Sequence, residues 1–188
     1  MGNASHIRAA QESDAAAIAV IYNEGISERQ ATFETDPRLA SDFLTRIASH
    51  RYPLLVADIG QQVVGWAGIG PYSERRVYAG IAEFSIYVAS TARGLGVGTL
   101  LCERLAEEAE DRGIYKLLGK LFPTNLPCVR LVSRCGFQTV GLHRRHGRLD
   151  GQWRDVLLVE RLLGDASLSA EADLTVRRHD ASPSVLSS

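Results

Sequence analysis

The chain has 188 residues, of which 45% are hydrophobic and 23% are charged, and its formal net charge is −1. This composition is ordinary for a soluble globular protein, and the length favours one domain with a sizeable core. A net charge this close to zero excludes a global field that attracts nucleic acid or an anionic membrane, and no apolar run approaches the roughly 18–20 residues that span a bilayer. The N-terminal segment lacks an apolar signal core and the three cysteines are an odd number, so we expect reduced thiols in a cytoplasmic protein.

The first half of the chain predicts a strand, two helices and a β-hairpin, in that order. Ser13 is a candidate N-cap for the first helix, and Asp36 and Pro37 suit the cap and first turn of the second. Two β-rich runs on either side of Gly60 and Gln61 predict the hairpin. The expected ranges are a strand at 6–10, helices at 14–25 and 37–50, and hairpin strands within 53–69.

The second half predicts two strand–helix units followed by two long strands. Residues 81–88 alternate cleanly, with Phe84 and Ile86 on one face and Glu83 and Tyr87 on the other. The remaining expected elements are a helix at 98–112, a strand at 115–122, a helix at 125–136 and two strands within 137–163 that meet at Asp150 and Gly151. Because hairpins occur beside strand–helix units, this order excludes a simple doubly wound sheet.

The sequence changes character after Gly164. The last segment is rich in Ser, Ala and Asp and has little periodicity. We therefore expect one domain at residues 1–165 and a mobile tail at 166–188.

Three glycines alternate at Gly94, Gly96 and Gly98, directly after a predicted strand and directly before a predicted helix. A turn without side chains lets backbone N–H groups converge on an anion, and the N-terminus of the helix adds unpaired N–H groups and its positive dipole end. The first turn of this helix has no acidic residue before Glu103, and Arg93 lies beside it. The pattern predicts a phosphate site.

Two kinds of phosphate-binding loop are excluded by the residues around these glycines. A Walker loop requires a lysine between the last glycine and a Ser or Thr, but Thr99 follows Gly98 directly. A dinucleotide-binding loop requires a third glycine at this position and an acid on the next strand, and residues 115–122 contain none. A tight strand-to-helix turn that binds nothing remains an alternative. The pattern Arg-x-x-Gly-x-Gly, formed by Arg93, Gly96 and Gly98, resembles the pyrophosphate loop of the Gcn5-related N-acetyltransferases (GNAT), which hold acetyl-CoA.

A wider resemblance covers about residues 7–163 and points to the phosphinothricin N-acetyltransferase branch of that family, with relatives that act on arsinothricin and on methionine sulfoximine or sulfone. It implies an α+β fold whose central mixed, largely antiparallel and twisted sheet has about seven strands and about four flanking helices. It also implies acetyl-CoA as co-substrate, a small amino acid analogue as acceptor, a role in resistance and a homodimer. The matching segments are "IYNEGI", "ATFETDPR", "YPLLVA", "AEFSIYV", "RGLGVG" and "GQWRDV".

Glu83 is the candidate general base. Acetyl transfer requires a neutral amine, so a positioned group must remove the proton. Glu83 stands in a strand with strongly apolar alternate residues, where partial burial is expected to make a carboxylate hold a proton more tightly. Its position also matches the base proposed for the branch. The alternative is a structural ion pair with Arg75 or Arg76.

The resemblance assigns the remaining site residues. Arg75 offers a planar fork for a carboxylate, phosphinate or arsinate, Tyr78 adds a ring and a hydroxyl, and Phe33 would wall the acceptor pocket. The alternatives are an exposed arginine on a polar loop and a core phenylalanine. The cofactor contacts implied are the backbone of Ile86, Tyr87 and Val88, the loop of Arg93, Gly94, Leu95, Gly96, Val97, Gly98 and Thr99, and Asn125, for which a helix cap is the alternative.

The helix at 125–136 departs from the family pattern. It contains no tyrosine to protonate the leaving thiolate, and Val132 stands where phosphinothricin enzymes can carry a histidine. Leu126 replaces the acid that follows the asparagine in the branch. We assign no general acid.

The basic segment from His143 to Arg148 raises the questions of metal and nucleic acid. His143 and His146 are three residues apart and would point to opposite faces of a strand, so we expect no metal site. The segment lacks interleaved aromatic residues, so we expect no nucleic-acid contact either. A solvated hairpin face or a contact with a partner subunit is expected instead.

Two other functions remain open from the sequence. One is a GNAT acetyltransferase for a protein or a polyamine, although a cationic amine does not seek an arginine. The other is an acyl-CoA-binding module without turnover.

Overall fold

The computed structural model describes residues 5–167, in which seven strands form one sheet of order β1-β2-β3-β4-β5-β7-β6. Neighbouring strands are antiparallel except for β4 and β5, which are parallel because α3 connects them. The expected α+β fold with a mixed, largely antiparallel sheet is confirmed. The strands are β1 (His6–Ala9), β2 (Leu54–Ile59), β3 (Gln62–Pro71), β4 (Ile81–Val88), β5 (Lys116–Leu121), β6 (Gln138–Leu149) and β7 (Gln152–Leu162).

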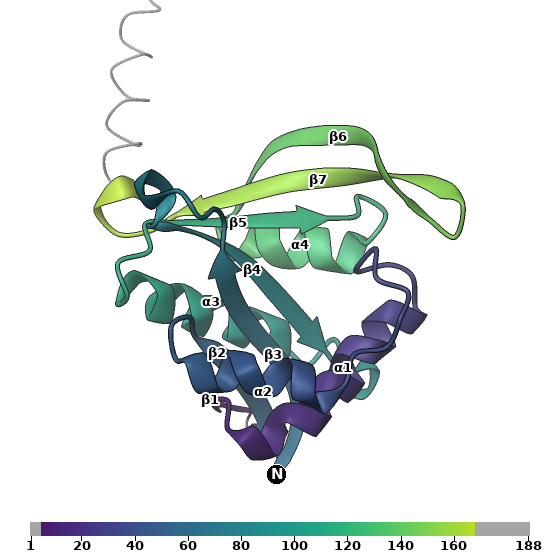
Figure 1. Cartoon of the computed structure of the whole chain (residues 1–188), viewed down its shortest axis with the longest axis vertical. Coiled ribbons are helices and arrows are strands. Elements are labelled where there is room, and N and C mark those ends of the chain that lie inside the picture. The colour runs from purple at the N-terminus through teal and green to yellow at the C-terminus, as the bar shows by residue number, and fades with distance from the viewer. Residues whose placement is uncertain (1–4, 168–188) are drawn as a thin grey trace, which may run out of the picture.

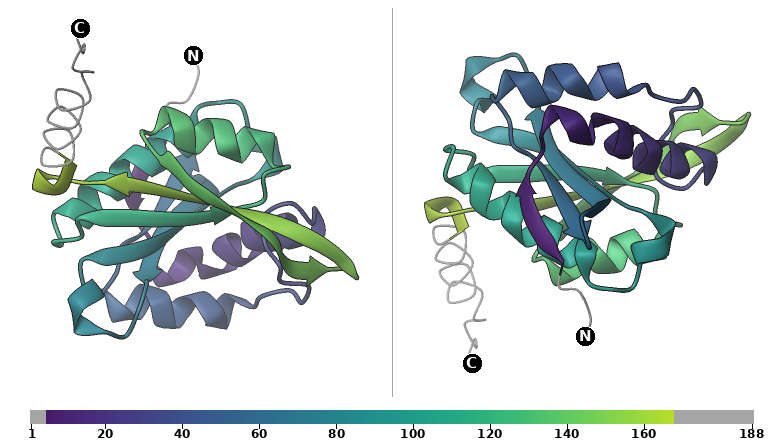
Figure 2. Two further views of the ribbon diagram at one scale, coloured as in Figure 1. Left: turned by 90° about the horizontal axis from the view of Figure 1, so that it is seen from above. Right: turned by 90° about the horizontal axis from the view of Figure 1, so that it is seen from below.

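Four α-helices cover the two faces of the sheet within these described residues: α1 (Ala15–Ser27), α2 (Ala40–Ser49), α3 (Val97–Glu110) and α4 (Leu126–Arg134). α1 and α2 lie on one face, and α3 and α4 on the other (Figure 2). Short 3-10 turns form η1 (Glu12–Asp14), η2 (Arg76–Tyr78) and η3 (Ser90–Ala92). No helix in this part of the chain has both the length and the apolar character that crossing a bilayer requires.

Strand β4 shows how the alternation in the sequence divides the core. Phe84, Ile86 and Val88 pack with the cluster beneath α3 and α4, whereas Tyr87 packs with the cluster beneath α1 and α2. Trp66 of β3 is buried in this second cluster. The predicted two-faced strand is therefore confirmed, with both faces covered by helices.

The ladder between β4 and β5 is short. It pairs only Ile81–Glu83 with Lys116–Leu118, the last pair being Glu83 with Leu118. Beyond that pair β4 continues along β3 and β5 continues along β7, so the two strands diverge and the sheet splits (Figure 1).

The predicted start of the second helix and the predicted cap of the first helix are wrong. The second helix begins at Ala40 because the Asn23 side chain holds the backbone of Arg38, accepting its N–H at 2.8 Å and donating to its carbonyl at 2.9 Å. Ser13 lies inside η1 and is not the cap, since the Asp14 carboxylate accepts the backbone N–H of Gln11 at 2.7 Å.

The outer part of the β6–β7 hairpin projects beyond the rest of the sheet and lies beside the segment that joins α1 and α2 (Figures 1 and 2). An ion pair of 3.0 Å joins Arg29 of that segment to Asp150 at the hairpin turn. The predicted boundary at residue 165 stays a prediction, and the predicted tail lies outside the described residues apart from positions 166–167.

Candidate active site

A cavity of about 520 Å³ occupies the split between β4 and β5. The split exposes the edge of β4 beyond Glu83, where no strand in the described part of the chain pairs with it on the β5 side. Ten of the predicted cofactor residues line the cavity: Ile86, Tyr87, Val88, Arg93, Gly94, Gly96, Val97, Gly98, Thr99 and Asn125. Leu95 does not line it and is 64% exposed. The predicted acceptor residues and Glu83 are also outside the lining.

The glycine turn forms one end of this cavity. Gly94 and Gly96 have φ values of +79° and +84°, a left-handed conformation that residues with a Cβ rarely adopt. Gly96 is the N-cap of α3, and its carbonyl accepts the N–H groups of Thr99 and Leu100. Among residues 5–167, no acceptor pairs with the N–H groups of Gly96, Val97 or Gly98. These donors and the absence of acids in the first turn of α3 make this end suited to an anion.

Arg93 is held beside the turn by two contacts. Its Nε donates to the Val88 carbonyl at 3.1 Å, and its Nη1 donates to the Glu28 carboxylate at 2.8 Å. The guanidinium therefore joins the end of β4 to the end of α1 while still lining the cavity.

Asn125 both lines the cavity and caps α4. Its Oδ1 accepts the N–H of Cys128 at 3.2 Å, and its Nδ2 donates to the Gln30 carbonyl at 3.0 Å. The helix-cap alternative is therefore confirmed as a structural role. The second contact fixes the segment after α1 to the other wall of the cavity.

An aromatic group that sequence reasoning missed supports the cavity from the side of α1. The ring of Tyr87 stacks on Trp66 with a centroid distance of 4.9 Å. It meets Tyr22 in an edge-on arrangement with a centroid distance of 4.8 Å. Burial and the nearby Tyr22 raise the pKa of Tyr87, which therefore stays protonated. The strand alternation predicted the face of Tyr87 but not its partners.

Cys128 also lines the cavity, near the start of α4. Burial raises the pKa of its thiol to about 11, so it is a neutral thiol at pH 7. All three cysteines are free, and Cys102 and Cys135 lie in the core with 2% and 1% exposure.

Glu83 sits where the β4–β5 ladder ends. Its side chain is 37% exposed, and its Oε1 lies 2.6 Å from the Nζ of Lys120 on β5. Glu83 does form an ion pair, but the expected partner, Arg75 or Arg76, is wrong. The parallel pairing of β4 and β5 brings Lys120 to the Glu83 carboxylate instead. Lys120, which the sequence did not single out, lines the cavity.

The predicted acceptor residues lie in two places. The guanidinium carbon of Arg75 is 5.5 Å from the ring centroid of Tyr78, and that ring meets Tyr72 edge-on at 5.7 Å. Phe33 packs edge-on against Phe122 at 4.8 Å, in a small core with Leu149, Val156 and Leu158. Phe122 lines the cavity, so Phe33 is one side chain removed from it.

The expectation that His143 and His146 point to opposite faces is wrong. The register of β6 on β7 shifts between His143 and Gly147, and Arg145 takes a positive φ of 50°. This bulge turns both rings to one side, with Nδ1 atoms 3.1 Å apart and centroids 4.7 Å apart. No group of three or more His, Cys, Asp or Glu residues suited to a metal ion occurs in the described part of the chain.

Comparison with known proteins adds an independent line of evidence. The model of the acetyltransferase (GNAT) family matches residues 18–137. The phosphinothricin N-acetyltransferase of Streptomyces viridochromogenes is 32% identical over 152 residues, covering 80% of this chain and 83% of that protein. The L-methionine sulfoximine/L-methionine sulfone acetyltransferase of Pseudomonas aeruginosa is 32% identical over 159 residues, covering 82% and 92%.

A solved structure agrees with these relatives. The GNAT superfamily phosphinothricin acetyltransferase of Sinorhizobium meliloti, crystallised in complex with acetyl-CoA, superposes with a TM-score of 0.82 at 27% identity. The match covers 87% of this chain and 91% of that one. The resemblance read from the sequence motifs is therefore confirmed, and the chain belongs to the acetyltransferase (GNAT) family.

Proposed function

We propose that this chain transfers the acetyl group of acetyl-CoA to the α-amino group of a small amino acid analogue of the phosphinothricin, arsinothricin or methionine sulfoximine type. The observation that carries the proposal is the cavity in the split sheet, at one end of which the N–H groups of Gly96, Val97 and Gly98 have no acceptor among residues 5–167. The names of the relatives support the acceptor class.

The two ends of the cavity suit the two parts of the cofactor. The N–H groups that open α3 are proposed to hold its diphosphate, together with the loop from Arg93 to Thr99. The unpartnered edge of β4 at Ile86, Tyr87 and Val88 suits an extended amide-bearing arm, as a sheet edge accepts an added strand. Acetyl-CoA bound in this way supplies the thioester, and the protein supplies its orientation.

Glu83 is proposed to accept the proton of the attacking amine. An α-amino group titrates near ~7.7–8, so only a modest basicity is needed at neutral pH. The carboxylate lies at the apex of the split, next to Phe84 and Ser85, which line the cavity. It can therefore meet an amine held over the thioester.

The acceptor is proposed to be oriented by three residues outside the lining of the cavity, Arg75, Tyr78 and Phe33. The Arg75 guanidinium rests over the Tyr78 ring, and no carboxylate among residues 5–167 pairs with it. An acidic group on the acceptor would give it a partner.

The proposal is tested by thiol release from acetyl-CoA with a panel of acceptors that includes phosphinothricin, methionine sulfoximine, arsinothricin, a polyamine and an N-terminal peptide. We expect release with the amino acid analogues and product masses one acetyl group heavier. Faster release with the polyamine or the peptide would favour the alternative acceptor class. Binding of acetyl-CoA without release for any acceptor would favour a binding module.

Glu83→Gln tests the base. We expect turnover to fall by about 100-fold or more, while calorimetry gives an unchanged affinity for acetyl-CoA because Glu83 is outside the cofactor end of the cavity. Turnover equal to that of the parent chain would remove Glu83 from this role.

A further inference from the structure

We infer that Glu83 and Lys120 together form the binding site for the zwitterionic head group of the acceptor, with the ammonium on Glu83 and the α-carboxylate on Lys120. The inference rests on the proposed function and names a substrate feature that the function leaves open. It makes Lys120 a specificity-determining residue that selects α-amino acids over simple amines.

Lys120 lies beside Glu83 at the point where β4 and β5 separate. Glu83 pairs with Leu118 in the last rung of the β4–β5 ladder, and Lys120 is two residues further along β5. Side chains at alternate positions share a face, so Lys120 lies on the face of Glu83, just past the point where the strands separate. The contact of 2.6 Å between Nζ and Oε1 therefore crosses the split at its apex, where the two strands begin to diverge.

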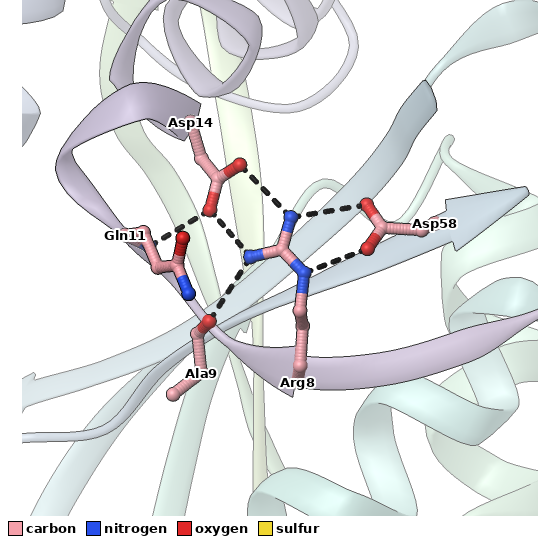
Figure 3. A network of polar contacts seen from close by, with 5 residues as sticks. All are labelled: Arg8, Ala9, Gln11, Asp14 and Asp58. Carbon is pink, nitrogen blue, oxygen red and sulfur yellow. Dashed lines mark hydrogen bonds and ion pairs between the residues drawn. The ribbon is translucent and has the colours of Figure 1, made fainter. Parts of the chain in front are cut away.

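The ion pair between Glu83 and Lys120 is largely exposed to solvent. The side chains of Lys120 and Glu83 are 52% and 37% exposed, and ion pairs this exposed contribute little to folding. By contrast, Arg8 lies between Asp14 and Asp58 at 2.7 Å from each, and the Asp14 side chain is 7% exposed (Figure 3). The Arg8 network is structural, whereas the Glu83–Lys120 pair costs little to open.

The two charges of an α-amino acid head group match those of Glu83 and Lys120. In an α-amino acid, one carbon separates the ammonium from the carboxylate, so the two charges lie about 3 Å apart. A head group inserted between Glu83 and Lys120 gives each side chain a new partner of opposite charge and leaves no charge unpaired. The contact between Glu83 and the ammonium is then also the contact through which the proposed base takes the proton.

The same arrangement disfavours the alternative acceptors. A polyamine or a lysine side chain brings an amine without a neighbouring carboxylate. Glu83 would then leave Lys120 for the incoming amine, and Lys120 would face a second positive charge in the cavity, which is unfavourable. Lys120 therefore acts by attraction toward one acceptor class and by repulsion toward the other.

The test crosses enzyme variants with matched acceptors. Lys120→Met, Lys120→Arg and the parent chain are assayed with methionine sulfoximine and phosphinothricin, and with the α-carboxamide of each. Lys116→Met is the control, because Lys116 is also on β5, makes a comparable ion pair of 2.9 Å with Glu160, and is outside the cavity.

In Lys120→Met we expect the KM of each acid to rise by about 10–100-fold, the loss of one charge-assisted contact. The KM of each carboxamide changes by less than about threefold, and that of acetyl-CoA stays constant. Lys120→Arg keeps the positive charge and recovers most of the loss for the acids, and Lys116→Met behaves as the parent chain.

Equal changes for acids and carboxamides, or no change for either, would overturn the inference while leaving the proposed function intact. So would an acetyl group found on Lys120 by mass spectrometry after incubation with acetyl-CoA alone, since Lys120 would then be an acceptor. A parent chain that releases no thiol with any acceptor would overturn the proposed function and the inference together.

Discussion

Gly96 serves both the fold, because it forms the turn into α3, and the candidate site, because it lies at the end of the cavity that is suited to an anion. Its φ of +84° lets the chain turn from η3 into α3, and its place at the N-cap leaves the following N–H groups pointing away from the helix ladder. A Cβ at this position would meet no atom within 4 Å, so space is not the reason for glycine. The backbone conformation is the reason.

Gly96→Ala is therefore expected to lower the free energy of unfolding by about 1–2 kcal/mol, the cost of a left-handed residue with a Cβ. If the turn relaxes to avoid this cost, the N–H groups move and the affinity for acetyl-CoA falls. Chemical denaturation and calorimetry measure the two effects.

Gly141→Ala is the matched control, because a Cβ there also meets nothing within 4 Å and φ lies outside the positive range. Losses of equal size in both variants would show that the conformation of Gly96 is not the cause.

The Arg8 network connects three secondary-structure elements, β1, β2 and α1 (Figure 3). Arg8 donates to Asp14 at the start of α1 and to Asp58 on β2, and Asp14 in turn accepts the N–H of Gln11. The hydrogen bonds from Arg8 hold the pKa of Asp14 below its usual value. Since the charged form is favoured in the folded chain, the contribution to stability is present above the usual value and is lost as pH falls through the lowered pKa.

Asp14→Asn is expected to reduce the free energy of unfolding by about 2 kcal/mol at pH 7. The difference from the parent chain should shrink as pH falls below about 4, the usual pKa of an aspartate, because the parent chain then loses the same charge. Urea denaturation at pH 7, 5 and 3 measures it.

Asp36→Asn supplies the control, since Asp36 is exposed and has no hydrogen bond or ion pair with residues 5–167. A difference between Asp14→Asn and the parent chain that stays constant down to pH 3 would contradict the role of the charge.

The whole molecule is held together across the cavity by contacts between segments that are distant in the sequence. Phe33, from the segment between α1 and α2, packs on Phe122 after β5 and on Leu149 and Val156 of the β6–β7 hairpin. Its ring also lies over Gly147, where a Cβ would meet it at 2.8 Å. One ring therefore ties the part of the sheet formed by β5, β7 and β6 to the segment after α1.

Phe33→Ala is expected to lower the free energy of unfolding by about 2 kcal/mol, since it removes a half-buried ring from this small core. Phe33→Leu should restore more than half of that stability. Val140→Ala on β6 is the control, because Val140 is 56% exposed. Unchanged stability in Phe33→Ala with a raised KM for the acceptor would assign Phe33 to the substrate alone.

Local sequence patterns determine several elements of this molecule and the glycine turn of its site. The alternation of residues 81–88 identified a two-faced strand, and the glycines at 94, 96 and 98 identified a bare turn before a helix. Both features depend on backbone geometry within a few neighbouring residues, so the sequence alone suffices for them. The same glycines and the wider motifs identified the family and therefore the sheet.

Only the tertiary structure decided which side chains meet. The parallel pairing of β4 with β5 gave Glu83 its partner Lys120, and a bulge in β6 turned His143 and His146 to one side. Pairing register and bulges arise from contacts between strands that are far apart in the chain, and a single residue of shift reverses the face of every side chain. The sequence therefore determines the elements and the turn of the site, while the register between strands determines which charges stand opposite one another in it.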